Sequence, residues 1–265
     1  MTDDELDGIC EQFEDAWDPS RSGPSEIRNF VSQLGHGLQA QSRLLISLAQ
    51  IDIELSWITW EKYLQSNERP LDPALLQGKF ESLPRASHYF ELFKDDLEFQ
   101  TNIRQLILAE ANCRSLFGDS ASDLYYSTHY GVELNSVQSI CRRQLKCIFQ
   151  ESVGRSDAVF KLHGRCTIGR QRSTDAESVF AEESPEGMRI VIAEHGKRGI
   201  SREQMALQLI SPRYAIVTNM SQSVPLRLGI GEQPVYKELE LEYLEAMVAP
   251  FPFVANLQIR LLKFF

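Results

Sequence analysis

The chain has 265 residues, of which 43% are hydrophobic and 24% are charged, and its net charge is −10. This composition supports hydrophobic cores and excludes an intrinsically disordered chain, and the length suits two domains of ordinary size. Residues 1–150 hold 13 Lys and Arg against 23 Asp and Glu, whereas residues 151–265 hold 14 of each kind. An acidic first half argues against nucleic acid or an anionic membrane as a partner.

Cysteine usage and the start of the chain indicate a cellular compartment. The five cysteines are an odd number without CxxC spacing, which favours free thiols in a reducing cytosol over disulfides or a zinc site. The first five residues are acidic and lack the apolar core of a signal peptide. No apolar stretch approaches the ~20 residues that cross a bilayer. We therefore expect a cytoplasmic protein without a membrane partner.

Apolar residues in the first half recur at the three- to four-residue spacing of amphipathic helices. Leu6, Ile9 and Phe13 show this spacing at the start of the chain. Asp72 followed by Pro73 is typical of an N-cap with proline at the first helical position, so a helix is expected to begin there. The spacing predicts further helices over residues 5–17, 25–34, 44–63, 99–117, 122–130 and 132–149.

These helices predict an acidic all-helical domain over residues 1–150 with a weak internal repeat. Each unit of about 40–50 residues would contain a long helix, a loop and a short helix that ends in an aromatic side chain. Trp57 and Trp60 lie at helical spacing and are expected in the core. Cys113 and Cys166 are expected to be small buried apolar side chains rather than nucleophiles.

Beyond residue 150 the apolar period changes to two, which is typical of antiparallel strands in a β-sandwich. We expect a linker at residues 151–157 and a sandwich domain over residues 157–265. The polar residues 173–186 are expected to form a mobile surface loop, and residues 248–253 and 257–262 to form the closing strands. The alternating residues are Val159 and Lys161; Cys166 and Ile168; Met188, Ile190 and Ile192; Met205, Leu207 and Leu209; Tyr214 and Ile216; Leu226 and Leu228.

Two polar turns in this second half combine an arginine with small polar groups. An apolar run ends in Gly169-Arg170. Some thirty residues later, Ser201-Arg202 precedes a second apolar run, and a third run ends near Asn219. Guanidinium forks and hydroxyl donors match the oxygens of a phosphate dianion. The pattern therefore indicates a phosphate-binding site formed by these turns.

The order of these elements resembles the forkhead-associated (FHA) domain. The signature of that family is an apolar strand into Gly-Arg, then Ser-Arg-x-His, then a loop carrying Asn-Gly. Gly169-Arg170 and Ser201-Arg202 match it, and the resemblance covers roughly the last 110 residues, the size of one domain. It implies a β-sandwich that binds phosphothreonine-containing protein segments. The first half resembles the helical extension found ahead of catalytic or FHA modules in some bacterial serine/threonine signalling proteins.

The resemblance implies a role for each matching residue. Arg170 would form a bidentate contact with the phosphate, and Ser201 would donate its hydroxyl hydrogen to the same group. Arg202 would add charge or contact the peptide backbone. Ser221 and Ser223 would lie in the loop that grips the peptide beside the phosphothreonine.

Two positions depart from the family signature. Gln204 stands where the family has histidine, and an amide can brace the same turn by hydrogen bonds. The Asn-Gly element is not intact, since Asn219 fits a strand-end position and Ser223 falls near the peptide-contacting Asn. A serine offers one hydroxyl where the amide offers donors and an acceptor. A degenerate FHA fold without phosphate binding is therefore an alternative, in which Gly169, Gln204 and Asn219 only support the loops.

Each of the two central residues also has a simpler interpretation. Arg170 would be an exposed strand-end arginine paired with Glu203. Ser201 would cap a tight turn after Gly199. The other basic residues expected around the turns are Arg165, Arg172, Lys197 and Arg198. The last three are expected to be exposed charges rather than ligands, which would raise the positive potential and favour acidic or phosphorylated partners.

The sequence shows no paired elements for catalysis. The five histidines are scattered without metal-ligand spacing, and neither the glycine-rich nucleotide loops nor the signature motifs of kinases are found. We therefore expect no enzyme activity, no cofactor and no metal site.

Together these features predict an α+β chain of two domains that acts as a non-catalytic signalling adaptor. Its expected partner is a phosphorylated protein or peptide, and a serine/threonine kinase or phosphatase is included among the possible partners. Two alternatives stay open from the sequence. One is an interaction scaffold that does not bind phosphate, and the other is the regulatory part of a kinase or phosphatase system.

Overall fold

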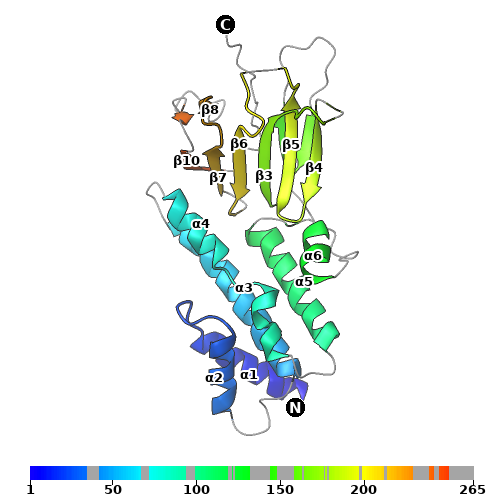
Figure 1. Ribbon diagram of the computed structural model, residues 1–265. Helices are drawn as coiled ribbons and strands as arrows, with labels where there is room; N and C mark the ends of the chain where they lie inside the picture. The colour runs from blue at the N-terminus through cyan, green and yellow to red at the C-terminus, as the bar shows by residue number, and fades with distance from the viewer. Residues whose placement is uncertain are drawn as a thin grey trace. The chain divides into compact units, whose positions relative to one another are not determined.

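A computed structural model gives the fold of the chain as two compact units (Figure 1). One unit is Met1–Glu68 with Gly78–Phe117, and the other is Arg69–Gln77 with Gly118–Phe265. The structure describes residues 1–34, 42–66, 72–93, 99–118, 121, 123–131, 144–147, 158–162, 164–175, 177, 179–196, 199–211, 214–228, 239–241 and 245–250.

The predicted helices before residue 131 are confirmed, and a short 3₁₀ helix is added to them. The first helix shows why the sequence begins it where it does: the Thr2 side chain accepts a hydrogen bond from the Glu5 backbone, and the Glu5 side chain caps Thr2 in return. The elements are α1 (Asp3–Ala16), α2 (Pro24–Gln33), α3 (Ser42–Ser66), α4 (Pro73–Glu81), η1 (Ala86–Leu92), α5 (Phe99–Phe117) and α6 (Asp123–Tyr130).

Helices α3 and α5 pack side by side and carry the core of the first unit. Leu48 and Ile53 of α3 and Leu106 of α5 are completely buried. The expected burial of Trp57 and Trp60 is confirmed, with exposed fractions of 3% and 4%. Both indole rings pack on Phe80, at ring-centroid distances of 5.9 and 6.1 Å.

A buried carboxylate ties four helical segments together. Asp52 of α3 accepts hydrogen bonds from Trp17 Nε1 after α1 (2.7 Å), from the Gly23 backbone before α2 (2.6 Å) and from the Tyr89 hydroxyl in η1 (2.8 Å). Three donors satisfy an acceptor that would otherwise be costly to bury. Burial of the Tyr89 phenol, together with the neighbouring Asp52 carboxylate, raises the pKa of Tyr89. The phenol therefore remains a hydrogen-bond donor.

The second unit contains a mostly antiparallel six-stranded sheet in the order β10-β7-β6-β3-β5-β4 (Figure 1). Its core side chains alternate along the strands, and Ile168, Ile190, Leu207 and Val217 are at most 1% exposed. Strands β1 (Gln144–Cys147) and β2 (Ala158–Lys161) form one antiparallel pair, and β8 (Leu226–Leu228) and β9 (Leu239–Leu241) form another. The strands of the main sheet are β3 (Arg165–Arg170), β4 (Phe180–Ser184), β5 (Gly187–Ala193), β6 (Met205–Leu209), β7 (Tyr214–Asn219) and β10 (Ala246–Pro250).

Three sequence expectations are corrected here. The helix predicted over residues 132–149 is wrong at Gln144–Cys147, which is a strand paired with β2. The surface loop predicted over residues 173–186 contains β4, because an exposed edge strand needs little apolar sequence. The strands are not all antiparallel, since β3 and β5 run parallel.

Some expectations fall partly or wholly outside the described residues. The linker predicted at residues 151–157 and the second closing strand predicted at 257–262 lie outside the described residues. The first closing strand, predicted over 248–253, overlaps β10 up to Pro250, and its last three residues lie outside. Within the described part of the chain, no helix is long and apolar enough to cross a bilayer.

Candidate phosphate-binding site

Strand register brings the predicted turns to one end of the main sheet. In the pairing of β3 with β6, Ile168 lies opposite Met205, and Met205 lies opposite Asn219 in the pairing of β6 with β7. Strand β3 therefore ends where β6 begins and where β7 ends. The parallel strand β5 ends at the same edge, since Arg170 pairs with Ala193. The turns that follow or precede these strand ends carry Gly169-Arg170, Ser201–Gln204 and Asn219–Ser223.

The first two turns are in direct backbone contact. Arg170 N donates to Ser201 O at 3.0 Å, and Gln204 N donates to Ile168 O at 2.9 Å. A Cβ atom at Gly169 would collide with the backbone carbonyl of Arg202. This contact explains the Gly-Arg motif. Gly169 lets the backbone of Ser201 and Arg202 approach β3, and Arg170, the residue after it, lies beside Ser201.

The Arg170 guanidinium is held by the turn after β5. Its Nη1 donates to the carbonyl oxygen of His195 at 2.6 Å. Its Nε is buried and has no hydrogen-bond partner among the described atoms. The pairing of Arg170 with Glu203, expected in the simpler interpretation, is not found. Glu203 instead pairs with Arg172 at 3.0 Å, with both side chains about half exposed.

An amide pair braces the second and third turns. Gln204 Oε1 accepts from Ser201 N at 3.0 Å, and Gln204 Nε2 donates to Asn219 Oδ1 and to Val224 O, both at 3.0 Å. The Asn219 side chain is completely buried and donates in turn to Val224 O (3.1 Å) and to Leu241 O (2.9 Å). Gln204 thus bonds to both turns, as expected of an amide, which both donates and accepts hydrogen bonds.

The three serines of the site differ in their surroundings. Ser201 Oγ lies 2.5 Å from Ser221 Oγ, so the two hydroxyls share a hydrogen bond. Ser221 is buried, at 3% exposed, whereas Ser201 is half-buried. Ser223 is exposed, and its backbone N–H donates to Ser221 Oγ.

Sequence reasoning missed an ion pair that anchors the turn after β3. Arg189 of β5 makes two contacts with Asp175, at 2.6 and 3.3 Å, and the two side chains are only 12% and 11% exposed. Asp175 also accepts from Arg172 N at 2.6 Å. Hydrogen bonds from Arg189 and then from Arg172 lower the pKa of Asp175 below its ordinary value of 3.8. No local pattern reveals this pair, because the partners lie fourteen residues apart.

The predicted basic residues do not all gather at this edge. Arg165 begins β3 and lies at the opposite end of the strand from Arg170, roughly 16 Å away at the rise of an extended chain. Arg202 is exposed beside Ser201. Lys197 and Arg198 lie outside the described residues.

The described part of the chain contains no group of three or more His, Cys, Asp or Glu that could hold a metal ion. Cys113 and Cys166 are buried free thiols, and burial raises the pKa of Cys113 to about 12, which keeps it protonated and unreactive.

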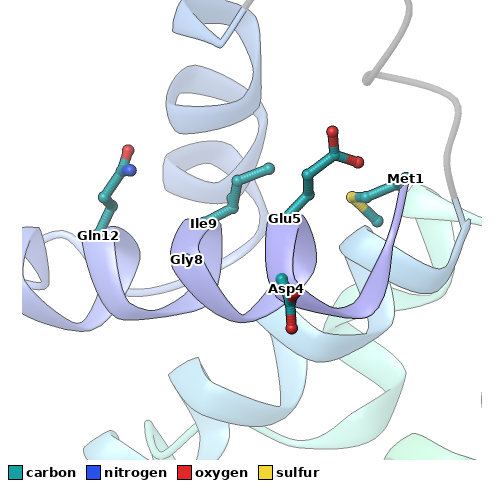
Figure 2. Close-up of a pocket in the computed structure, with 6 residues that line it drawn as sticks. All are labelled: Met1, Asp4, Glu5, Gly8, Ile9 and Gln12. Atoms are coloured by element: carbon teal, nitrogen blue, oxygen red, sulfur yellow. The ribbon is translucent and has the colours of Figure 1, made fainter.

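A depression on α1 does not resemble a binding site. Figure 2 shows that the labelled side chains come from α1 and from Met1 ahead of it, and the described residues that line the depression all lie on this one segment. A single helix face does not provide the converging groups of a ligand site. The residues that line the depression are Met1, Asp4, Glu5, Gly8, Ile9 and Gln12.

Comparisons with models of protein families, with curated proteins and with solved structures found no match to this chain.

Proposed function

We propose that this protein is a non-catalytic, cytoplasmic signalling adaptor that binds phosphothreonine-containing protein segments at the edge formed by the turns after β3, before β6 and after β7. Arg170 and Ser201 would bind the phosphate, and Arg202 would contribute charge. The resemblance of the second half to the FHA family is the source of this proposal.

The observation that carries the proposal is the backbone hydrogen bond between Arg170 N and Ser201 O. It joins two turns that are thirty-one residues apart and places a guanidinium-bearing residue beside a hydroxyl-bearing one. Because a charged hydrogen bond to a dianion is stronger than a neutral one, such a pair favours a phosphate over an uncharged threonine. The close approach at Gly169 fixes the same two turns, and the Gln204–Asn219 brace joins the second of them to the third.

The test is a library of phosphothreonine peptides and their unphosphorylated counterparts, screened against the full chain. Arg170→Ala should weaken binding of the selected phosphopeptide by about tenfold or more, the usual worth of a hydrogen bond to a charged group. Arg165→Ala is the matched control, because it removes an arginine from the other end of the same strand. Retained binding by Arg170→Ala, or equal loss from both variants, would remove Arg170 from the site.

A second candidate function is a protein-interaction scaffold that does not bind phosphate. The contact of Arg170 with His195 O and that of Ser201 with Ser221 favour it, since both groups already have partners within the chain. The serine at position 223 favours it too, because it cannot replace both functions of an amide. This candidate predicts a bound protein whose affinity is the same for phosphorylated and unphosphorylated forms.

A further inference from the structure

The hydroxyl of Ser221 is surrounded by donors. Its Oγ lies 2.9 Å from the backbone nitrogen of Val224 and 3.3 Å from that of Ser223, and both N–H groups donate to it. The third neighbour is Ser201 Oγ at 2.5 Å. A backbone N–H can only donate, so both of these bonds use the lone pairs of the Ser221 oxygen.

Counting protons then fixes the direction of the bond between the two serines. A hydroxyl has two lone pairs and one hydrogen. With both lone pairs of Ser221 engaged, its hydrogen is the group left to bond Ser201. Ser221 is therefore the donor and Ser201 the acceptor, an assignment made from the hydrogen-bond network. The hydrogen of Ser201 is not used in this bond and is available to another acceptor.

We infer that Ser221 is a positioning residue: it orients the Ser201 hydroxyl so that its hydrogen is presented to a phosphate oxygen, and it does not touch the ligand itself. This inference rests on the function proposed above. The burial of Ser221 and the partial exposure of Ser201 agree with these separate roles. Accepting a hydrogen bond also polarises the Ser201 O–H and makes it a stronger donor.

Ser221 is itself held by the amide brace. Its backbone N–H donates to Asn219 Oδ1 at 3.1 Å, the same oxygen that accepts from Gln204 Nε2. The hydrogen bonds thus run from Gln204 through Asn219 and Ser221 to Ser201. They connect the buried end of β7 to the group that would meet the phosphate, without a ligand contact by any of the first three residues.

A double-mutant cycle on the full chain tests the inference, with the phosphothreonine peptide selected from the library as probe. Ser201→Ala should weaken binding about tenfold, the worth of one hydrogen bond to a charged group. Ser221→Ala should weaken it about threefold to tenfold by freeing the Ser201 rotor. In the Ser201→Ala background, Ser221→Ala should have no further effect, because its action passes through the missing hydroxyl.

Ser211→Ala is the matched control. Ser211 is a buried serine that accepts a backbone hydrogen bond from Tyr214 in the turn at the other end of β6 and β7. The Ser211→Ala substitution should lower the melting temperature as Ser221→Ala does, but it should leave peptide affinity unchanged. If Ser221→Ala does not fold, Ser221→Cys replaces it in the cycle, since a thiol is only a weak donor.

The outcomes separate the two proposals. Suppose that the wild type binds the phosphopeptide, but that the affinity losses of the two single variants add up in the double variant or that Ser221→Ala loses no affinity. Either result would overturn the positioning role alone. No preference of the wild type for phosphorylated peptides would overturn the proposed function, and the positioning role with it. If Ser221→Ala weakens binding of the phosphopeptide only in the protein that retains Ser201, both proposals are supported.

Discussion

At Gly169, the backbone of the turn that carries Ser201 and Arg202 packs directly against strand β3. The Arg202 carbonyl occupies the place where a side chain would begin, and Ser201 O lies 2.9 Å from the same point. Any larger residue must push away the backbone that carries Ser201. Close packing of this kind transmits a small change in volume directly to the turn.

Gly169→Ala is therefore expected to lower the free energy of unfolding by about 1–3 kcal/mol, the usual cost of overpacking, and to weaken phosphopeptide binding as well. Denaturant unfolding and peptide titration measure the two effects. Gly196→Ala is the control, because a Cβ atom there meets nothing within 4 Å, so its stability should match the wild type. A Gly169→Ala protein as stable as the wild type would contradict the close approach.

Asp175 makes the stability of the site depend on pH. Its pKa is lowered in the folded state, chiefly by hydrogen bonds from Arg189, so its stabilising effect is present above its ordinary pKa of 3.8. That effect is lost as pH falls through the lower folded pKa. Asp175→Asn should therefore be less stable than the wild type at pH 7, and the difference should shrink below about pH 4. Unfolding measured from pH 7 to pH 3 tests this, and a difference that does not change with pH would contradict it.

At the scale of elements, the helical unit is organised around one buried carboxylate. Asp52 joins the end of α1, the start of α2 and the middle of η1 to the middle of α3 by three hydrogen bonds of 2.6–2.8 Å. A second buried carboxylate, Glu110 of α5, accepts from Ala86 N at the start of η1 and pairs with Arg114. Short helices with little apolar surface are thus located by polar bonds as well as by packing.

Asp52→Ala should lower the free energy of unfolding by at least about 3 kcal/mol, because it leaves three donors unpaired at about 1–3 kcal/mol each. Urea unfolding followed by circular dichroism measures this loss. The control is Asp3→Ala, which removes an ion pair with Arg43 whose side chains are 79% and 63% exposed. Its effect should stay below about 1 kcal/mol. Equal effects of the two variants would show that the Asp52 bonds add little.

Elements with strong apolar periodicity were predictable, and those without it were not. The helix α3 has an apolar side chain at every turn, and β6 has a large apolar side chain at every second position, so both follow from local sequence. Strand β1 is too short for a period of two to be told from one of three or four. Strand β4 is exposed on most of its length and is defined only by its pairing with β5.

The candidate site was predictable to the same extent. Its turns follow strand ends that the alternation marks, so their residues could be named in advance. The partners of their side chains could not, because Arg170 bonds a carbonyl twenty-five residues away and Asp175 bonds a side chain fourteen residues away. Such contacts are set by the parallel placement of β5 beside β3, which the sequence does not encode locally.

At the scale of the whole molecule, an acidic first half is joined to a second half with equal numbers of acidic and basic residues. Long-range attraction of a phosphopeptide by net charge is therefore not expected. Recognition would depend on the few groups at the sheet edge, where Arg170, Arg172 and Arg202 lie in neighbouring turns. Short-range contacts of this kind discriminate between ligands by hydrogen bonds rather than by overall potential.

The central claim is tested most directly by calorimetric titration of the full chain with one peptide in two forms, phosphorylated and unphosphorylated on the same threonine. The account predicts that the phosphorylated form binds at least tenfold more tightly, and that Arg170→Ala removes this difference. Equal affinity for the two forms, or a difference that survives Arg170→Ala, would contradict it.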